Sequence, residues 1–225
     1  MKTARLWIAI VQPSVLVAVA MWWVGNVEVA MLTYVFAACW LVPWLLLGVR
    51  PLSSRGGFPF LPRLDPGEKR VRKAVLHWLV FGPCMVGAFT LLRPWMGDPE
   101  HYRAQLALLG WNDSHFPWYV FVFVVFVPLA EEWWWRGQVL PRTIDRYGRR
   151  AGIAITALGF AGYHVFVLVR LYDPLAVVIR MTAIYGAGLF WSWLAARERR
   201  WGMAYLGHQA ADTGIVGIFQ LFFRA

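Results

Sequence analysis

Ionisable side chains interrupt apolar sequence at three places in the second half of the chain. They are Glu131, Glu132, Arg136, His164, His208 and Asp212. A charge at the centre of a bilayer costs at least about 2.5–3.5 kcal/mol, so such groups usually face a cavity or each other. The sequence therefore predicts that these side chains form one polar site inside an apolar protein.

Carboxylates and imidazoles in a pocket of low dielectric fit water activation and carbonyl polarisation. Glu131 could act as a general base that deprotonates a water molecule, assisted by His164. His208, oriented or polarised by Asp212 four residues later, could stabilise the resulting oxyanion. This pattern favours hydrolysis of an amide or a related carbonyl compound.

Glu132 and Arg136 are also four residues apart, where they can pair and fix the helix that presents Glu131. Adjacent carboxylates point about 100° apart on a helix, so the two Glu residues cannot have the same role. In the alternative interpretation, all three form a solvated charge cluster at the membrane interface, beside the Trp133-Trp134-Trp135 run.

A zinc site is a second chemical option for the same residues. Glu131, His164 and His208 would supply one carboxylate and two imidazoles, with an open position for water. The sequence contains no HExxH motif, and the three candidate ligands lie on separate apolar stretches. No cofactor is certain from the sequence, and Zn²⁺ is the candidate.

The elements that must position these residues are membrane-spanning helices. Of the 225 residues, 60% are hydrophobic and 15% are charged, against about 45–50% and about 25% in soluble domains. The apolar runs do not alternate in polarity, so they favour helices over a β-barrel. We expect an all-α, polytopic transmembrane bundle of about seven spans. The spans are Leu6–Val24, Val29–Val49, Ala74–Leu92, Phe116–Leu140, Ala151–Val169, Leu175–Ala196 and Trp201–Phe223.

Positive charge is distributed unequally between the gaps that separate these spans. With the N-terminus in the cytoplasm, the inner segments hold 16 Lys and Arg residues (2 + 7 + 4 + 3) and the outer segments hold 4. The alternation requires an odd number of spans and predicts a cytoplasmic N-terminus. The net charge of +10 then indicates anionic lipid headgroups as partners, and not nucleic acid.

The depths of the polar residues agree with one another. At a rise of about 1.5 Å per residue, Glu131 lies about 15 Å from the cytoplasmic end of its helix. His164 lies about 20 Å from the cytoplasmic end of the next helix, and His208 and Asp212 about 10 and 17 Å from that of theirs. These four side chains are therefore predicted to meet in one layer.

Three motifs carry a family resemblance. They are Glu131-Glu132-x-x-x-Arg136, Phe160-x-x-x-His164 and His208-x-x-x-Asp212. Together, from the fourth span onward, they resemble the CPBP intramembrane protease family, also called the Abi or CAAX-protease family, with its Rce1-like members. The Trp run and the short chain are similar to the bacterial myxosortase-like group, which implies the bacterial cytoplasmic (inner) membrane.

The resemblance also implies roles. Glu131 and His164 would activate water, and His208 and Asp212 would form the oxyanion site, in a glutamic or a metallo-type endopeptidase. Asp212 stands where Asn is common in prenyl-processing members. Because an ionised Asp cannot donate a hydrogen bond, it is either protonated or supports His208. Phe160 would support the site by packing.

The resulting hypothesis is a single integral-membrane domain over residues 1–225. Residues 1–92 would form three accessory spans and residues 115–225 the catalytic core. It would cleave a membrane-anchored protein or peptide, as in C-terminal tail or CAAX-like processing. Two alternatives remain: a proton-coupled membrane transporter, and a non-catalytic bacteriocin-immunity or scaffold protein. The sequence does not indicate the oligomeric state.

Overall fold

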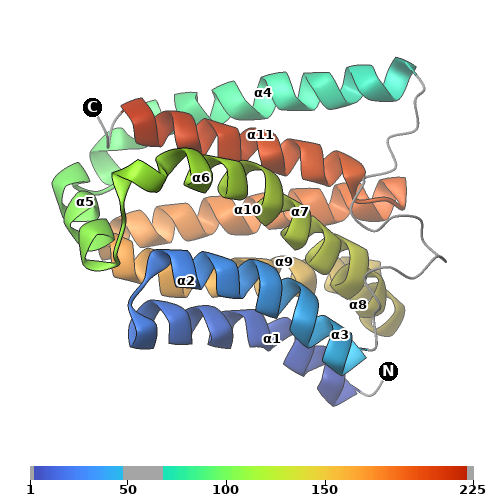
Figure 1. Ribbon diagram of the computed structural model, residues 1–225. Helices are drawn as coiled ribbons and strands as arrows, with labels where there is room; N and C mark the ends of the chain where they lie inside the picture. The colour runs from blue at the N-terminus through green and yellow to red at the C-terminus, as the bar shows by residue number, and fades with distance from the viewer. Residues whose placement is uncertain (1–2, 48–67, 222–225) are drawn as a thin grey trace.

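A computed structural model describes residues 3–47 and 68–221, and within these ranges it contains helices and no strand (Figure 1). The predicted all-α class is confirmed. The loop expected at residues 51–65 lies outside the described residues.

The helices of the first half surround a described gap at residues 48–67. They are α1 (Thr3–Val19), the π-helical η1 (Ala20–Val24), α2 (Val27–Leu32), the π-helical η2 (Thr33–Leu41), α3 (Val42–Leu47), α4 (Glu68–Leu92), the 3₁₀ turn η3 (Arg93–Trp95) and α5 (Pro99–Leu108).

The second half begins with one long element made of several helical segments. They are the 3₁₀ turn η4 (Asp113–His115), α6 (Phe116–Phe121), the π-helical η5 (Val122–Phe126), α7 (Val127–Glu131), the π-helical η6 (Glu132–Val139) and α8 (Leu140–Tyr147). Three further helices follow: α9 (Arg149–Leu171), α10 (Pro174–Glu198) and α11 (Gly202–Phe219).

Six helices of the described chain are long and apolar enough to cross a membrane. They are Thr3–Val24, Val27–Leu45, Val75–Trp95, Asp113–Tyr147, Arg149–Leu171 and Pro174–Glu198. The protein is therefore a multi-pass integral membrane protein. The seventh predicted span corresponds to α11, which is less apolar because it carries His208, Gln209 and Asp212. The exact count of seven spans stays a prediction.

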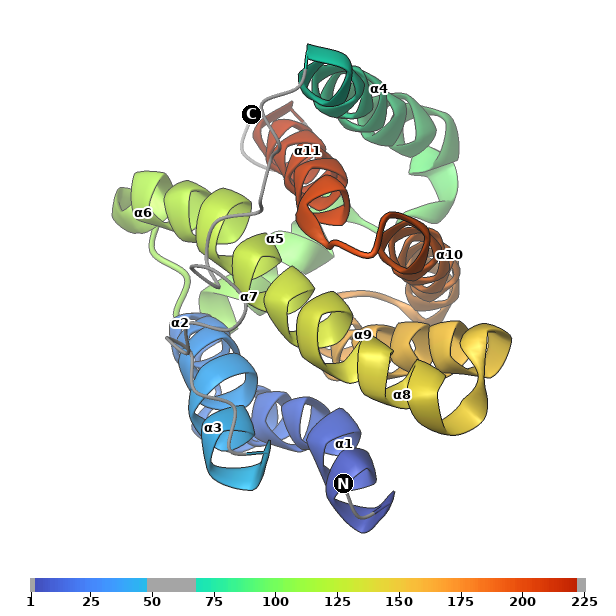
Figure 2. The same ribbon diagram turned by 90° about the vertical axis from the view of Figure 1, so that its right-hand side faces the viewer.

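The long element from α6 to α8 crosses the middle of the bundle. Viewed from one end (Figure 2), α1, α2 and α3 lie on one side of it, and α4, α10 and α11 lie on the other. Helix α9 packs against α1, α8 and α10, and α4 packs along α11. Residues on α7 and η6 can therefore contact helices from both halves of the chain.

The surface of the bundle is apolar, whereas charged groups lie inside it. Trp23 is 89% exposed and Leu91 is 78% exposed, and many other large apolar side chains also face outward. Glu131, Glu132 and Arg136 are buried. An exposed apolar surface of this extent fits contact with lipid.

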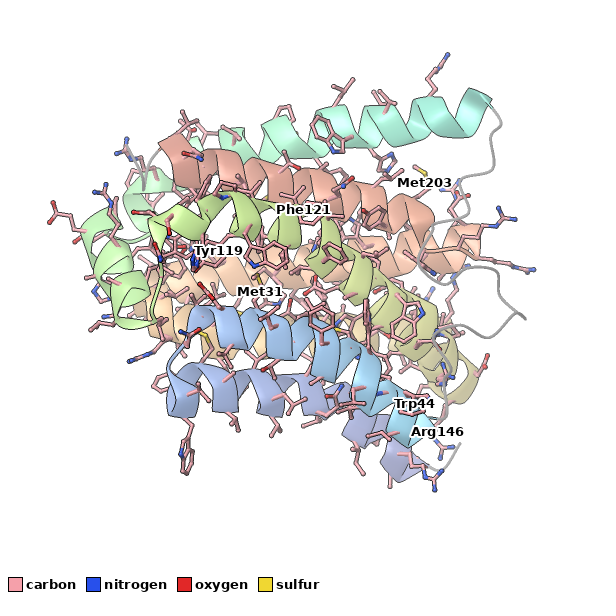
Figure 3. The ribbon with its side chains drawn as sticks, viewed as in Figure 1. Met31, Trp44, Tyr119, Phe121, Arg146 and Met203 are labelled. Carbon is pink, nitrogen blue, oxygen red and sulfur yellow. The ribbon has the colours of Figure 1, made fainter. Side chains whose placement is uncertain are left out.

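The connections between helices separate into two ends of the bundle. The start of α1, the α8–α9 junction and the α10–α11 junction lie at one end, and α5 and the α9–α10 junction lie at the other (Figure 1). Arg146 lies near the first end and Tyr119 near the second (Figure 3). This arrangement agrees with the alternation from which the N-terminus was predicted to be cytoplasmic, and the side of the membrane stays a prediction.

Asp and Asn side chains begin the helices at the α5 end of the bundle. The side chains of Asn26, Asp98 and Asp173 accept hydrogen bonds from the backbone N–H groups of the first turns of α2, α5 and α10. Pro99 and Pro174 follow two of these caps at the first helical position. Caps and N-terminal prolines of this kind fix where a helix begins.

Gly159 allows three helices to meet beside the polar site. A Cβ atom at this position would lie 2.6 Å from the Trp135 ring and 2.9 Å from the Ile10 side chain. Close helix approach at the small residues of α9 was expected from the sequence. Trp135 has no exposed surface, so its ring has little room to move away.

We predict that Gly159→Ala destabilises the protein by about 1–3 kcal/mol, because overpacking displaces Trp135 and Ile10. Gly186→Ala is the matched control, since a Cβ at Gly186 in α10 meets no atom within 4 Å. The control substitution should be neutral or mildly stabilising, because Ala favours a helix over Gly. Thermal unfolding in detergent measures both, and equal melting temperatures for the two variants would contradict the prediction.

Candidate active site

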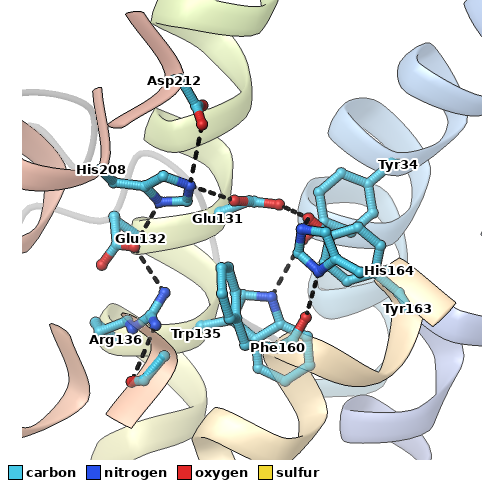
Figure 4. A network of polar contacts seen from close by, with 11 residues as sticks. Tyr34, Glu131, Glu132, Trp135, Arg136, Phe160, Tyr163, His164, His208 and Asp212 are labelled. Atoms are coloured by element: carbon cyan, nitrogen blue, oxygen red, sulfur yellow. Dashed lines mark hydrogen bonds and ion pairs between the residues drawn. The ribbon is translucent and has the colours of Figure 1, made fainter. Parts of the chain in front are cut away.

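The predicted polar residues form one connected network in the middle of the bundle (Figure 4). Glu131 ends α7 and Glu132 begins η6, so both carboxylates project from the long central element. His164 comes from α9, and His208 and Asp212 come from α11. The structure thus brings together residues from three separate apolar stretches, as their depths predicted.

Glu132 and Arg136 form a fully buried ion pair. Arg136 Nη1 lies 2.6 Å from Glu132 Oε1, and both side chains have 0% exposure. Arg136 Nη2 donates to the Gly188 carbonyl of α10 at 3.3 Å. The predicted pair is present, and the alternative of a solvated charge cluster is wrong because the charges and the three Trp rings are buried.

His208 lies among three carboxylates. Its Nδ1 is 2.9 Å from Glu132 Oε1, and its Nε2 is 3.1 Å from Glu131 Oε2 and 3.8 Å from Asp212 Oδ1. Because Glu132 already accepts from the permanently protonated Arg136, it also accepts from His208, whose Nδ1 therefore carries a proton. The Glu132–Arg136 pair thereby fixes the orientation and tautomer of His208.

Glu131 divides its two oxygens between different helices. Oε2 faces His208, and Oε1 accepts a hydrogen bond from the Tyr163 hydroxyl of α9. Tyr34 of η2 also hydrogen-bonds to this carboxylate. Adjacent Glu131 and Glu132 therefore have different partners, as their directions on the helix predicted, although both contact His208.

His164 reaches Glu131 through Tyr163. Its Nε2 lies 3.0 Å from the Tyr163 hydroxyl, and its Nδ1 donates to the Phe160 carbonyl one turn earlier at 3.0 Å. The hydrogen bond to Phe160 holds the imidazole against its own helix. His164 is partly exposed, whereas Glu131 and His208 are buried.

Aromatic rings form the walls around the charged groups. Trp191 of α10 stacks on the His208 ring with centroids 4.2 Å apart. The Phe160 ring lies under the Arg136 guanidinium, 4.4 Å from its central carbon, and meets the His208 ring edge-on. Such contacts stabilise the cation and exclude water from the buried side of the network.

The candidate zinc ligands are not arranged around one point. Within the described residues, no group of three His, Cys, Asp or Glu side chains has the geometry to hold a metal ion. His164 directs its two nitrogens at Phe160 and Tyr163, and His208 directs its own at carboxylates. The set Glu131, His164 and His208 does not fit a zinc site in this arrangement.

Three aromatic residues join the network that sequence reasoning did not place in the candidate site. Tyr34, Tyr163 and Trp191 contact Glu131, His164 or His208. Tyr163 could have been found from its position next to His164. Tyr34 and Trp191 lie in apolar helices without a motif, so the sequence contained no signal for them.

Residues 113–214 match the family model described as type II CAAX prenyl endopeptidase Rce1-like. The match covers the long central element, α9, α10 and most of α11, and it confirms the predicted resemblance. No curated protein and no solved structure matches the chain at a significant level. Because the matched family is a protease family, the match supports a protease acting on a membrane-embedded protein. The myxosortase-like assignment stays a prediction.

We predict that Arg136→Met destabilises the protein by about 3–5 kcal/mol, because Glu132 is then left as a buried charge without its partner. The double variant Glu132→Gln/Arg136→Met should recover much of this loss, since it removes both charges. Unfolding in detergent against temperature measures the effect. Equal losses in the single and double variants would show that the lost packing of Arg136 on Phe160 dominates.

Proposed function

We propose that this chain is an intramembrane endopeptidase that hydrolyses a peptide bond in the C-terminal tail of a membrane-anchored, CAAX-like substrate. One observation carries the proposal: Glu131, buried in an apolar bundle, lies 3.1 Å from His208 Nε2. This places a general base beside a hydrogen-bond donor for an oxyanion. The family match over residues 113–214 supports the same reaction class.

In the proposed mechanism Glu131 accepts a proton from a water molecule as the water oxygen attacks the peptide carbonyl carbon. A positioned carboxylate base contributes about 10²–10⁴-fold to such a step. Glu131 then returns the proton to the leaving nitrogen as the C–N bond breaks. The carboxylate is thereby regenerated, and atoms and protons balance over the cycle.

His208 would stabilise the oxyanion through its Nε2–H group. Since Nδ1 already donates to Glu132, a donating Nε2 requires the doubly protonated ring. The positive charge of this ring is balanced by Glu131, Glu132 and Asp212, which surround it. In this proposal Asp212 supports His208 and does not itself donate to the oxyanion, and no step depends on a metal.

The proposed location is the bacterial cytoplasmic membrane, with the N-terminus in the cytoplasm. Arg142, Arg146, Arg149 and Arg150 lie at the end of the bundle where the chain begins. The excess of Arg at this end supports a cytoplasmic position for it. A substrate tail would then reach Glu131 from the cytoplasmic half of the bilayer.

Glu131→Gln should reduce cleavage of a farnesylated, internally quenched CAAX peptide by about 10²–10⁴-fold, because Gln keeps the shape of Glu but cannot accept the proton. The assay uses purified protein in liposomes. Glu198→Gln, at an exposed carboxylate at the end of α10, is the matched control and should cleave at the wild-type rate.

The same two variants can be compared in cells by quantifying C-terminal peptides of membrane proteins. Substrates that lose these peptides with wild type and Glu198→Gln, but not with Glu131→Gln, would identify the natural target. Cleavage at full rate by Glu131→Gln would contradict the mechanism. Identical peptide profiles, together with no cleavage in liposomes, would favour the scaffold or transporter alternative.

We also expect that cleavage persists after exhaustive dialysis against 1,10-phenanthroline. Both ring nitrogens of His164 and of His208 already have protein partners, so neither offers a free lone pair to zinc. Elemental analysis of the dialysed protein provides the control. Loss of activity that added Zn²⁺ restores would overturn the metal-free mechanism.

A further inference from the structure

Two stacked tyrosines hold the carboxylate of Glu131 from the side opposite His208. The rings of Tyr34 and Tyr163 are stacked, with centroids 4.1 Å apart and planes 28° from parallel. Both side chains are buried, and both hydroxyls hydrogen-bond to Glu131. Figure 4 shows the pair between Glu131 and His164.

The hydrogen bonds of His164 determine what the Tyr163 hydroxyl can do. The Phe160 carbonyl only accepts, so His164 Nδ1 carries a proton. In a neutral ring Nε2 is then an acceptor, and it lies 3.0 Å from the Tyr163 oxygen. Tyr163 has a single proton, so it cannot donate to His164 and to Glu131 at the same time.

Two proton arrangements satisfy every contact. In the first, protonated Glu131 donates to the Tyr163 oxygen, and Tyr163 donates to His164 Nε2. In the second, Tyr163 donates to ionised Glu131, and doubly protonated His164 donates to the Tyr163 oxygen. Both contain the same number of protons, and they interconvert when one proton moves from Glu131 to Tyr163 and another from Tyr163 to His164.

Tyr34 contacts the same carboxylate but lacks the second connection. Trp135 Nε1 donates to the Tyr34 oxygen at 3.1 Å. This leaves the Tyr34 proton free to point at Glu131. Within the described chain, no hydrogen bond joins Tyr34 to His164. Tyr34 can therefore orient Glu131 but cannot pass a proton on.

We propose that Tyr163 is a positioning residue that relays a proton between Glu131 and His164, and that Tyr34 of η2 locks the carboxylate in place for this relay. The proposal rests on the proposed function. It explains how His164 takes part although its hydrogen bonds go to Tyr163 and Phe160. It also makes the second span, which lies outside the family match at residues 113–214, a part of the site and not an accessory element.

The test compares Tyr163→Phe with Tyr34→Phe, because each removes one hydroxyl from the same stacked pair. Each should lower kcat for the farnesylated CAAX peptide by about 10- to 100-fold with KM changed less than about 2-fold. Tyr147→Phe, at the end of α8, is the control and should keep wild-type kcat. All variants are first checked for unchanged melting temperature.

A double-mutant cycle with His164→Ala separates the two tyrosines. If Tyr163 acts through His164, Tyr163→Phe should lower kcat less than about 2-fold further in the His164→Ala protein. Tyr34→Phe should keep its full effect in that background. An equal loss from Tyr163→Phe in both backgrounds would overturn the relay and leave Tyr163 a packing residue.

A second measurement requires no cleavage. In ¹⁵N-histidine-labelled protein in detergent micelles, Tyr163→Phe should shift the Nε2 resonance of His164, whereas Tyr34→Phe should leave it in place. The resonance is assigned with His164→Ala. A shift found in a protein that cleaves nothing would support the hydroxyl contact and reject the proposed function. An unchanged resonance in an active enzyme would overturn the relay alone.

Discussion

The buried ion pair between Glu132 and Arg136 is the interaction on which the rest of the site depends. Two charges removed from water are tolerated only when each is paired and further hydrogen-bonded. Arg136 also reaches the Gly188 carbonyl and lies over the Phe160 ring, while Glu132 accepts from His208. One pair thereby connects the central element to α9, α10 and α11. The orientation of His208 follows from a requirement of stability as much as from one of chemistry.

The two adjacent glutamates show how one helix can present a structural and a reactive carboxylate side by side. Glu132 is held by a permanent cation, so it has little freedom to change its charge. Glu131 has hydroxyls on one oxygen and an imidazole on the other, and all of these partners can exchange protons. The π-helical turn that begins at Glu132 belongs to a class of local distortion that is frequent at functional sites.

The extent of the network differs from the extent of the family match. The match covers residues 113–214 and contains every motif residue. Tyr34 and its partnership with Trp135 lie partly outside it, on a helix from the first half of the chain. Because the long central element crosses the middle of the bundle, helices on both of its sides can reach Glu131 (Figure 2). The division into accessory and catalytic spans therefore does not describe how the site is built.

The sequence alone determined the helical class, the membrane location and the residues that meet in the core. Apolar runs that do not alternate leave no other fold in lipid, and a charge within such a run must find a partner. The tertiary structure decided which partners those are. Glu131 was expected to lack a local partner, and its contacts come from η2, α9 and α11, far away in sequence. Tyr34 and Trp191 are apolar enough to fit any lipid-facing or core position, so no pattern distinguished them. Their roles appear only when the helices pack, because packing sets the directions of side chains from separate helices, whereas periodicity sets them only within one helix.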